Sequence, residues 1–204
     1  SHIEPEELVS IIDSVQEDRS CLNPVDRWIL HRYSEVVEEA TDSADCYQFD
    51  RSVRAVVDFL WLEVADHYLE IVKGRIGKKD RATIFSLYNI GLGIAKLLAP
   101  VLPHTTEEVY QSYYRRFQND ISIHLSKWPK PLLKDEEGAR IGRMAVDVIA
   151  AVRRFKSENR IPLGSPMRAI RLVTDQPKQL EGSTDDIRST LKACLLYTSP
   201  SPRD

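Results

Sequence analysis

Residues 23–73 read NPVDRWILHRYSEVVEEATDSADCYQFDRSVRAVVDFLWLEVADHYLEIVK, and this stretch decides the fold class. Its apolar residues recur at intervals of three and four, the spacing of a helix with one buried face. We predict a first helix from a cap at Asn23 to about Asp42, and a second from about Asp50 to Lys73. A proline and an acid in the first turn favour this start of the first helix. Two amphipathic helices of this length predict a helical bundle.

The apolar stripes of these two helices define the predicted core. We expect Trp28, Trp61 and Tyr68 to be buried, because large aromatic side chains on an apolar stripe supply much of a core. Truncation of Trp61 should then cost about 3–5 kcal/mol of stability. The predicted core positions are Val25, Trp28, Ile29, Val36, Val37 and Ala40 in the first helix, and Val53, Val56, Val57, Leu60, Trp61, Val64, Tyr68, Ile71 and Val72 in the second.

A third helix is predicted from a cap at Asp80 to Leu98, and prolines shortly after it favour a break. Gly91 and Gly93 lie in the middle of this helix, where each lowers helix propensity by about 1 kcal/mol relative to alanine. Glycine in such a position usually marks a close neighbour. We therefore expect another backbone to approach the helix there.

A fourth helix is predicted over residues 106–117, because Thr105 and Glu108 have the spacing of a capping box. Residues upstream of the first helix contain a short amphipathic piece from Glu4 to Val15. Four helices joined by short connections predict an up-and-down bundle, so the chain is expected to be mainly α.

The C-terminal part of the sequence predicts a different arrangement. Residues 121–129 are expected to be a short extended segment, and acids at 135–137 open a long helix to about Glu158. Residues 167–173 read as a strand, and Ser183 or Thr184 caps a last helix. This order predicts the start of a small α+β subdomain. The expected buried face of the long helix is Ile141, Met144, Ala145, Val148, Ile149, Val152 and Phe155.

Four segments follow from these patterns. Residues 1–22 form an N-terminal helical or linker segment, residues 23–120 the helical bundle, and residues 121–193 the long helix with the partial subdomain. Residues 194–204 read CLLYTSPSPRD, which resembles the translation of a transposase sequencing adapter. We expect this tail to be foreign to the protein and exclude it from the fold prediction, with Ala193 as a point of truncation.

Composition narrows the function classes. The chain has 204 residues, 42% of them hydrophobic, and no apolar run long enough to cross a bilayer, so we expect a soluble, cytoplasmic protein. The net charge of −3 argues against a protein that coats nucleic acid without specificity, and any RNA contact must come from local basic patches. Three cysteines lack the spacing of metal ligands. No phosphate loop, zinc motif or framed nucleophile is present, so no catalytic or metal-binding residue is predicted.

Two basic clusters are the candidate binding residues. The first lies at the end of the second helix and in the loop after it. The second lies on the long helix, where its spacing of three and four predicts one face turned away from Phe155. Either cluster could contact an RNA backbone, and either could be a solvated helix end or helix face. The candidates are Lys73, Arg75, Lys78, Lys79 and Arg81 in the first cluster, and Arg153, Arg154, Lys156 and Arg160 in the second.

Four motifs occur in one order along the chain: D-R-W-I-L, Y-x-F-x-x-S, F-x-W-x-E-x-x-D-x-Y-L-E-x-x-K and P-x-x-P-H-x-T-E-E-V-Y. In this order they resemble the anticodon-binding helical domain of valyl-tRNA synthetases, with archaeal-type enzymes as the best match. The resemblance covers about residues 23–173. It supports the mainly helical fold and implies that Arg153, Arg154 and Lys156 lead toward the tRNA-facing side.

The resemblance implies a partner and a reaction. The partner is a tRNA, in particular tRNA(Val), bound through its anticodon arm, with neither DNA nor a membrane involved. The intact enzyme would ligate valine to tRNA with ATP and Mg²⁺, whereas this stretch lacks the H-I-G-H and K-M-S-K-S signatures and would hold no cofactor. Isoleucyl, leucyl and methionyl enzymes share the bundle and remain alternatives. A helical protein-interaction module without RNA binding is a further alternative, and the salt dependence of binding would distinguish it.

Overall fold

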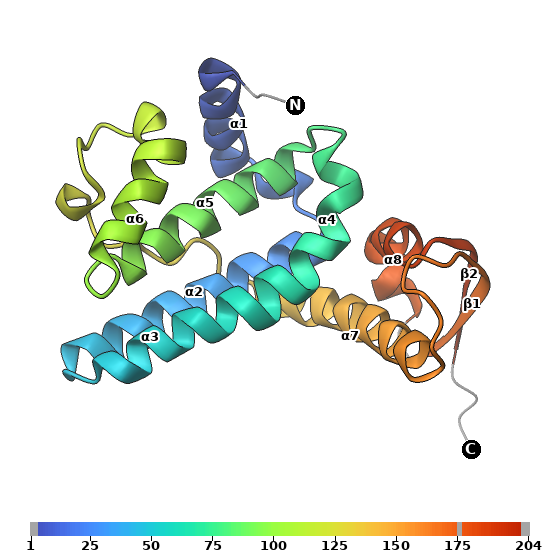
Figure 1. The fold of residues 1–204 in the computed structure, drawn as a ribbon. Helices are drawn as coiled ribbons and strands as arrows, with labels where there is room; N and C mark the ends of the chain where they lie inside the picture. Colours follow the sequence, from blue (N-terminus) through green and yellow to red (C-terminus); the bar gives the residue numbers. More distant parts are fainter. Residues whose placement is uncertain (1–3, 175–176, 201–204) are drawn as a thin grey trace.

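The computed structural model describes residues 4–174 and 177–200. Most of these residues are helical, as the sequence predicts, and two strands follow near the C-terminus (Figure 1). The elements are α1 (Pro5–Glu17), α2 (Pro24–Asp45), α3 (Phe49–Asp58), a π-helical segment (Phe59–Tyr68), α4 (Leu69–Ile76), α5 (Arg81–Leu98), α6 (Pro103–Val109), α7 (Glu136–Glu158), β1 (Met167–Thr174), α8 (Thr184–Leu191) and β2 (Ala193–Pro200). Short π and 3₁₀ turns complete the described chain, at Arg19–Cys21, Tyr110–Tyr114, Arg115–Phe117, Ile123–Leu125 and Pro177–Ser183.

Helix α2 is the centre of the bundle. It begins where its capping residues predict, with the backbone N–H of Asn23 donating to Oδ2 of Asp26 at 3.2 Å. Helices α3, α5 and α7 all pack against it (Figure 1). Its side chains Trp28, Ile29 and Tyr33 are almost fully buried. The predicted core of this helix is therefore confirmed, and one hydrophobic cluster joins the bundle to α7 and α8.

The second predicted helix is continuous from Phe49 to Ile76, but its middle is π-helical. A π-helix bonds residue i to residue i+5, so it holds more residues per turn than an α-helix. The buried positions in this segment are Phe59, Val64 and Tyr68, and the first two are five residues apart. Trp61 is turned to solvent and is 63% exposed. The prediction that Trp61 belongs to the core is wrong, because the buried positions of a π-helical stretch do not follow the α-helical period.

Helix α5 is capped by Asp80, whose carboxylate accepts a hydrogen bond from the Thr83 backbone at 2.9 Å. The close approach predicted at its glycines comes from tyrosine side chains rather than from another backbone. A Cβ on Gly93 would lie 1.9 Å from Oη of Tyr33, and a Cβ on Gly91 would lie 2.3 Å from Oη of Tyr114. Gly93 thus lets a buried aromatic ring of α2 lie against the helix.

Helix α6 begins at Pro103, three residues before the predicted start. Proline is well placed in a first helical turn, and the hydroxyl of Thr106 donates to the carbonyl oxygen of Leu102 at 2.9 Å. The capping box expected at residue 105 is not the start of this helix. The 121–129 segment contains a 3₁₀ turn at Ile123–Leu125, with extended backbone at Ser122 and Ser126, so the extended segment predicted there is interrupted by this turn.

Helix α7 begins at the predicted position, with Asp135 accepting from the Gly138 backbone at 2.9 Å. Its buried face is rotated by about one residue from the predicted one. Phe155 was expected in the core and is 54% exposed, whereas Lys156 is 2% exposed. The small residue Gly142 explains the rotation, because a Cβ there would lie 2.1 Å from the carbonyl oxygen of Pro24. The helix packs its small residues against α2, and this close contact, rather than the period of the apolar residues, sets which face is buried.

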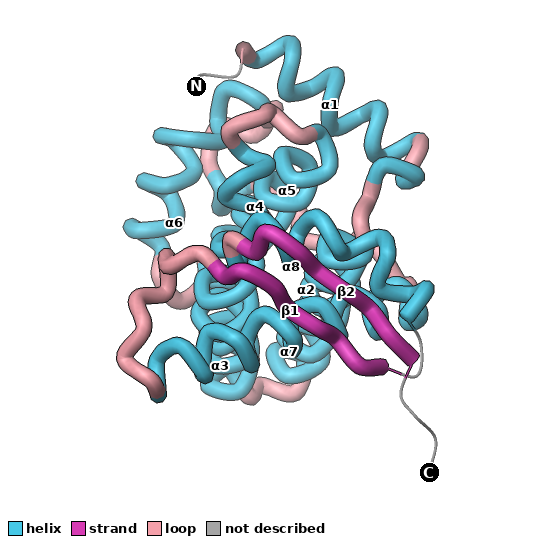
Figure 2. The backbone as a smooth tube through the Cα atoms, turned by 90° about the vertical axis from the view of Figure 1, so that its right-hand side faces the viewer, coloured by secondary structure: helices cyan, strands magenta, loops and turns pink. Residues whose placement is uncertain are grey.

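The C-terminal unit contains the predicted strand and the predicted last helix. Strand β1 pairs in parallel with β2, with Met167 opposite Ala193, and α8 lies between them in the chain. Figure 2 shows the two strands side by side. Most of β2 is formed by the tail that the fold prediction left out, and the foreign origin of that tail stays a prediction. In the described part of the chain, no helix is both long and apolar enough for a membrane span.

Candidate nucleic-acid interface

Arg75, a candidate RNA contact, instead forms the centre of a buried ion-pair network. Its guanidinium donates to both carboxylate oxygens of Asp26, at 2.7 and 3.0 Å, and Asp26 is fully buried. Its Nε lies 3.2 Å from Oδ1 of Asp186 on α8, and Asp80 is 3.5 Å away. Tyr68 donates its hydroxyl to Asp26 at 2.7 Å. The arginine therefore joins α2, α4 and α8, and it is not free for a phosphate.

Burial sets the electrostatics of this network. It raises the pKa of Asp186 to about 6, although the positive charge of Arg75 acts in the opposite direction. Burial and the nearby Asp26 carboxylate also raise the pKa of Tyr68. Burial disfavours the charge on Arg75, but its hydrogen bonds to Asp26 and the charges of Asp26 and Asp186 together outweigh that effect and raise its pKa. Three carboxylates around one guanidinium leave a net negative charge at this joint.

The other members of the first cluster diverge. Lys73 forms an ion pair with Glu70, one turn earlier on α4. Lys79 pairs with Glu7 of α1 at 3.1 Å, and Arg81 donates to the Ser14 hydroxyl. These two contacts hold α1 against the loop before α5 and the first residue of α5. Lys78 is exposed. The first cluster therefore does not present its five cations on one surface.

The second cluster is also divided. Lys156 points inward, and its amine donates to the carbonyl oxygens of Leu163, Ser165 and Leu191, at 3.1, 2.8 and 3.5 Å. Burial, with a smaller effect of the Lys192 charge, lowers the pKa of Lys156. Arg154 and Arg160 are exposed. The predicted common face is wrong, because Lys156 holds the turn after α7 and the end of α8 in place.

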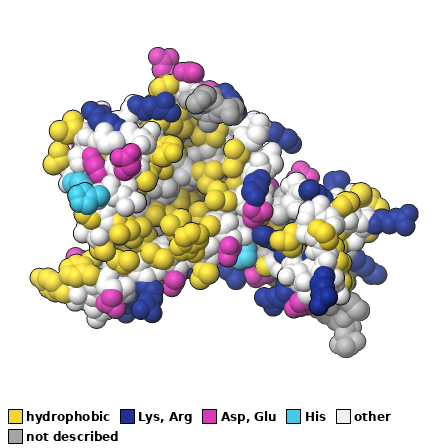
Figure 3. Space-filling model, in the orientation of Figure 1, with side chains coloured by type: hydrophobic (Ala, Val, Ile, Leu, Met, Phe, Trp, Pro, Cys, Tyr) yellow, Lys and Arg dark blue, Asp and Glu magenta, His cyan; other side chains and the backbone are white. Residues whose placement is uncertain are grey.

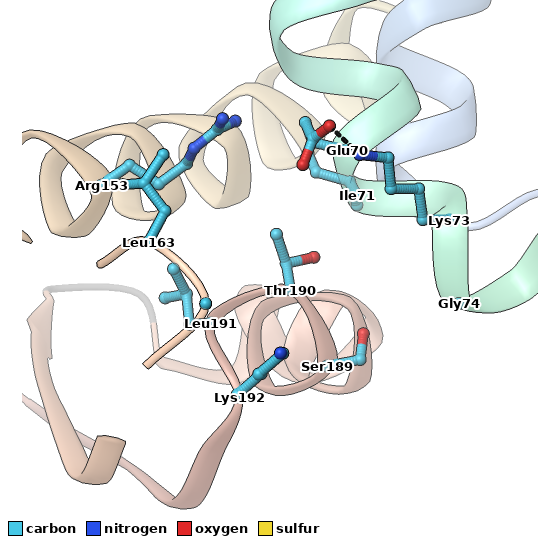
Figure 4. Close-up of a pocket in the computed structure, with 11 residues that line it drawn as sticks. Glu70, Ile71, Lys73, Gly74, Arg153, Leu163, Ser189, Thr190, Leu191 and Lys192 are labelled. Carbon is cyan, nitrogen blue, oxygen red and sulfur yellow. Dashed lines mark hydrogen bonds and ion pairs between the residues drawn. The ribbon is translucent and has the colours of Figure 1, made fainter. Parts of the chain in front are cut away.

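The structure nevertheless brings one cation of each cluster to the same pocket. Lys73 of α4 and Arg153 of α7 line a pocket of about 290 Å³ together with Lys192, the residue directly after α8 (Figure 4). Figure 4 shows Arg153 on the side opposite Lys192, and Lys73 beside Glu70 on the third side. The three cations come from three separate elements. Their charges make the pocket attractive to an anion such as a phosphate group.

Lys192 was not among the sequence candidates. It adopts a left-handed conformation with φ of 52° at the end of α8, where a lysine is favoured by the helix dipole. Its place beside Lys73 and Arg153 depends on how α8 docks on α4 and α7. The sequence does not indicate that Lys192 lies near Lys73, since more than a hundred residues separate the two.

A second pocket, of about 780 Å³, is less suited to an anion. Asp80, Asp185 and Asp186 line it, alongside Arg75, Lys78 and Arg188. Because Arg75 is already bound to Asp26, the acids dominate the field here. Lys78 is therefore placed beside a negative surface, which would oppose a phosphate backbone.

The face shown in Figure 3 is mostly apolar between α5 and α3, with Lys and Arg side chains toward its margins. The exposed side chains of Trp61 and Leu62 lie on the π-helical segment. A surface of this kind offers few charges to a phosphate backbone. The polar and cationic wall formed by α4, α7 and α8 is the better candidate interface.

Comparison with known proteins supplies a family. The family described as "Anticodon-binding domain of tRNA ligase" matches residues 26–172. The chain is 33% identical over 177 residues to a valine–tRNA ligase of Pyrococcus furiosus, and the match covers 83% of this chain and 20% of that protein. A valine–tRNA ligase of Methanothermobacter thermautotrophicus is 38% identical over 177 residues, with coverage of 82% and 20%. The chain spans about a fifth of the length of these curated relatives.

Proposed function

The chain belongs to the family of anticodon-binding domains of tRNA ligases, and we propose from this premise that it binds the anticodon arm of a tRNA. The observation that carries the proposal is the match of the family over most of the chain. The cationic pocket of Lys73, Arg153 and Lys192 supports it, because backbone phosphates are the main source of affinity in RNA binding. Of the nine candidate residues, Lys73 and Arg153 are the two that this pocket joins.

We further propose that the tRNA is tRNA(Val) and that the domain is part of a valine–tRNA ligase. The relatives with 33–38% identity named above carry that name, and all match over the same large share of this chain. In such an enzyme the bundle would supply recognition and position, while another part of the protein joins valine to tRNA with ATP and Mg²⁺. The proposed setting is cytoplasmic.

The experiment compares RNA hairpins with the anticodon arms of tRNA(Val) and of the isoleucine, leucine and methionine tRNAs. Binding to the 204-residue chain is measured by fluorescence anisotropy at low and moderate salt. We expect the valine hairpin to bind most tightly, and a change of its second anticodon base to weaken binding by roughly 1–3 kcal/mol, the usual cost of one mismatched contact. Equal affinity for all four hairpins would contradict valine specificity. Absence of binding to any of them would contradict the RNA-binding role.

A further inference from the structure

We propose that the pocket between α4, α7 and α8 seats one backbone phosphate of the bound RNA, with Lys192 as its principal ligand. This inference rests on the proposed function and assigns a particular chemical group to a particular place. The lining residues include three cations, Lys73, Arg153 and Lys192, and one carboxylate, Glu70. A phosphate group fits, since the volume of about 290 Å³ is roughly ten times the ~30 Å³ that one water occupies in the liquid.

The donors in the pocket can be assigned one by one. Within the described residues, the Lys192 amine has no hydrogen bond or ion pair, so all three of its donors are open to a ligand. Arg153 uses one nitrogen, Nη1, to donate to the carbonyl oxygen of Asp66 at 2.9 Å. A guanidinium carries five N–H groups, which leaves several for a phosphate. The hydroxyls of Ser189 and Thr190 donate to the carbonyl oxygen of Asp186 and are occupied.

Glu70 does not close the pocket to anions. Its carboxylate is paired with Lys73, and the Lys73 side chain is 65% exposed. Exposed pairs of this kind contribute little stability, so Lys73 can turn toward a phosphate at small cost. The negative end of the α8 dipole is also partly neutralised, because the Lys156 amine donates to the carbonyl oxygen of Leu191. The net field in the pocket is therefore positive.

The apolar walls strengthen this field. Ile71 and Leu191 are buried, and they form part of the lining together with Leu163. Side chains of this kind lower the local dielectric, so each cation attracts a phosphate more strongly than it would in open water. The pocket also lies where α8 meets the bundle. A phosphate held there would contact the bundle and the C-terminal unit at once, and would favour their docked arrangement.

The experiment uses the 204-residue chain and three variants. Lys192→Met removes the charge, Lys192→Arg keeps it, and Lys130→Met removes an exposed lysine that does not line the pocket. Affinity for the valine anticodon hairpin is measured over a salt series. We expect Lys192→Met to weaken binding roughly tenfold at low salt and to reduce the slope of log K against log salt by about 1. Lys192→Arg should keep most of the affinity, and Lys130→Met should change little.

NMR titrations of the same proteins identify the ligand. We expect the valine hairpin to shift the backbone amide signals of Ser189 and Lys192 in the wild type, and to shift them much less in Lys192→Met. Shifts with inorganic phosphate but none with RNA would overturn the proposal in favour of a site for small anions. If the wild type binds the hairpin and Lys192→Met binds it equally well, Lys192 is not a phosphate ligand and this proposal is wrong, while the proposed function stands. Failure of the wild type to bind the hairpin overturns both.

Discussion

Arg75 and Asp26 form a bidentate ion pair across the bundle, with distances of 2.7 and 3.0 Å, although they are 49 residues apart in the sequence. Replacing Arg75 with methionine leaves the fully buried Asp26 carboxylate without its counter-ion. We expect the free energy of unfolding to fall by about 3–5 kcal/mol, the usual effect of breaking a buried pair. Chemical denaturation of Arg75→Met measures this, with the exposed Lys78→Met as control. A loss below about 1 kcal/mol would show that the pair is not buried in solution.

Asp186 gives the fold a pH dependence with a definite sign. Its pKa is about 6 in the folded chain, because of burial, and about 4 in an unfolded chain. Between these values the folded chain binds more protons, so the contribution of Asp186 to stability falls as the pH rises from about 4 to 6. Arg75, Asp26, Asp80 and Asp185 are the charged groups that act on it.

We therefore expect Asp186→Asn to be similar in stability to the wild type near pH 4. At pH 7 the variant should be more stable, by up to about 2–3 kcal/mol. Denaturation curves of both proteins across this range measure the difference. A variant that is less stable than the wild type at pH 7 would contradict the raised pKa, and would mean that the Asp186 charge contributes net attraction to Arg75.

The two tryptophans of the bundle should differ sharply. Trp28 is 1% exposed and lies in the main hydrophobic cluster, whereas Trp61 is 63% exposed. We expect Trp28→Ala to cost about 3–5 kcal/mol and Trp61→Ala to cost less than about 1 kcal/mol. Denaturant unfolding of both variants makes the comparison. A large loss in Trp61→Ala would show that the second helix keeps an α-helical period and has no π-helical turn.

Lys156 should act on stability as a structural residue. Methionine at this position leaves the carbonyl oxygens of Leu163 and Ser165 without their donor, and the side chain is buried. We expect Lys156→Met to lower the free energy of unfolding by about 2–3 kcal/mol. The exposed neighbour Arg154→Met is the matched control and should change it by less than about 0.5 kcal/mol. Similar thermal unfolding of both variants would place the Lys156 amine in solvent.

Local signals predicted much of the fold. Asn23, Asp80 and Asp135 lie at the starts of three helices, because a cap depends on residues only two or three positions away. Which side of each helix is buried was harder to predict from the sequence. The π-helical segment and the contact of Gly142 with Pro24 both arise from packing between distant elements, and they turned Trp61 and Phe155 outward.

The binding residues were harder to predict than the helices. A basic residue looks the same in the sequence whether it faces RNA or a buried carboxylate. Arg75 and Lys156 both form hydrogen bonds inside the fold. Arg75 donates to the Asp26 carboxylate, and Lys156 donates to backbone carbonyl oxygens. Lys192 joins Lys73 and Arg153 only through the docking of α8. The partner surface is therefore a tertiary property, which the spacing of charges along one helix does not contain.

The most direct test of the account is a hydroxyl-radical footprint of the 204-residue chain on a complete tRNA(Val) transcript. We predict protection of the anticodon stem and loop, and loss of both protection and binding in a variant that removes Lys73, Arg153 and Lys192. The acceptor end should stay open to cleavage. Protection of the acceptor arm, or an unprotected anticodon arm at protein concentrations that saturate binding, would contradict it.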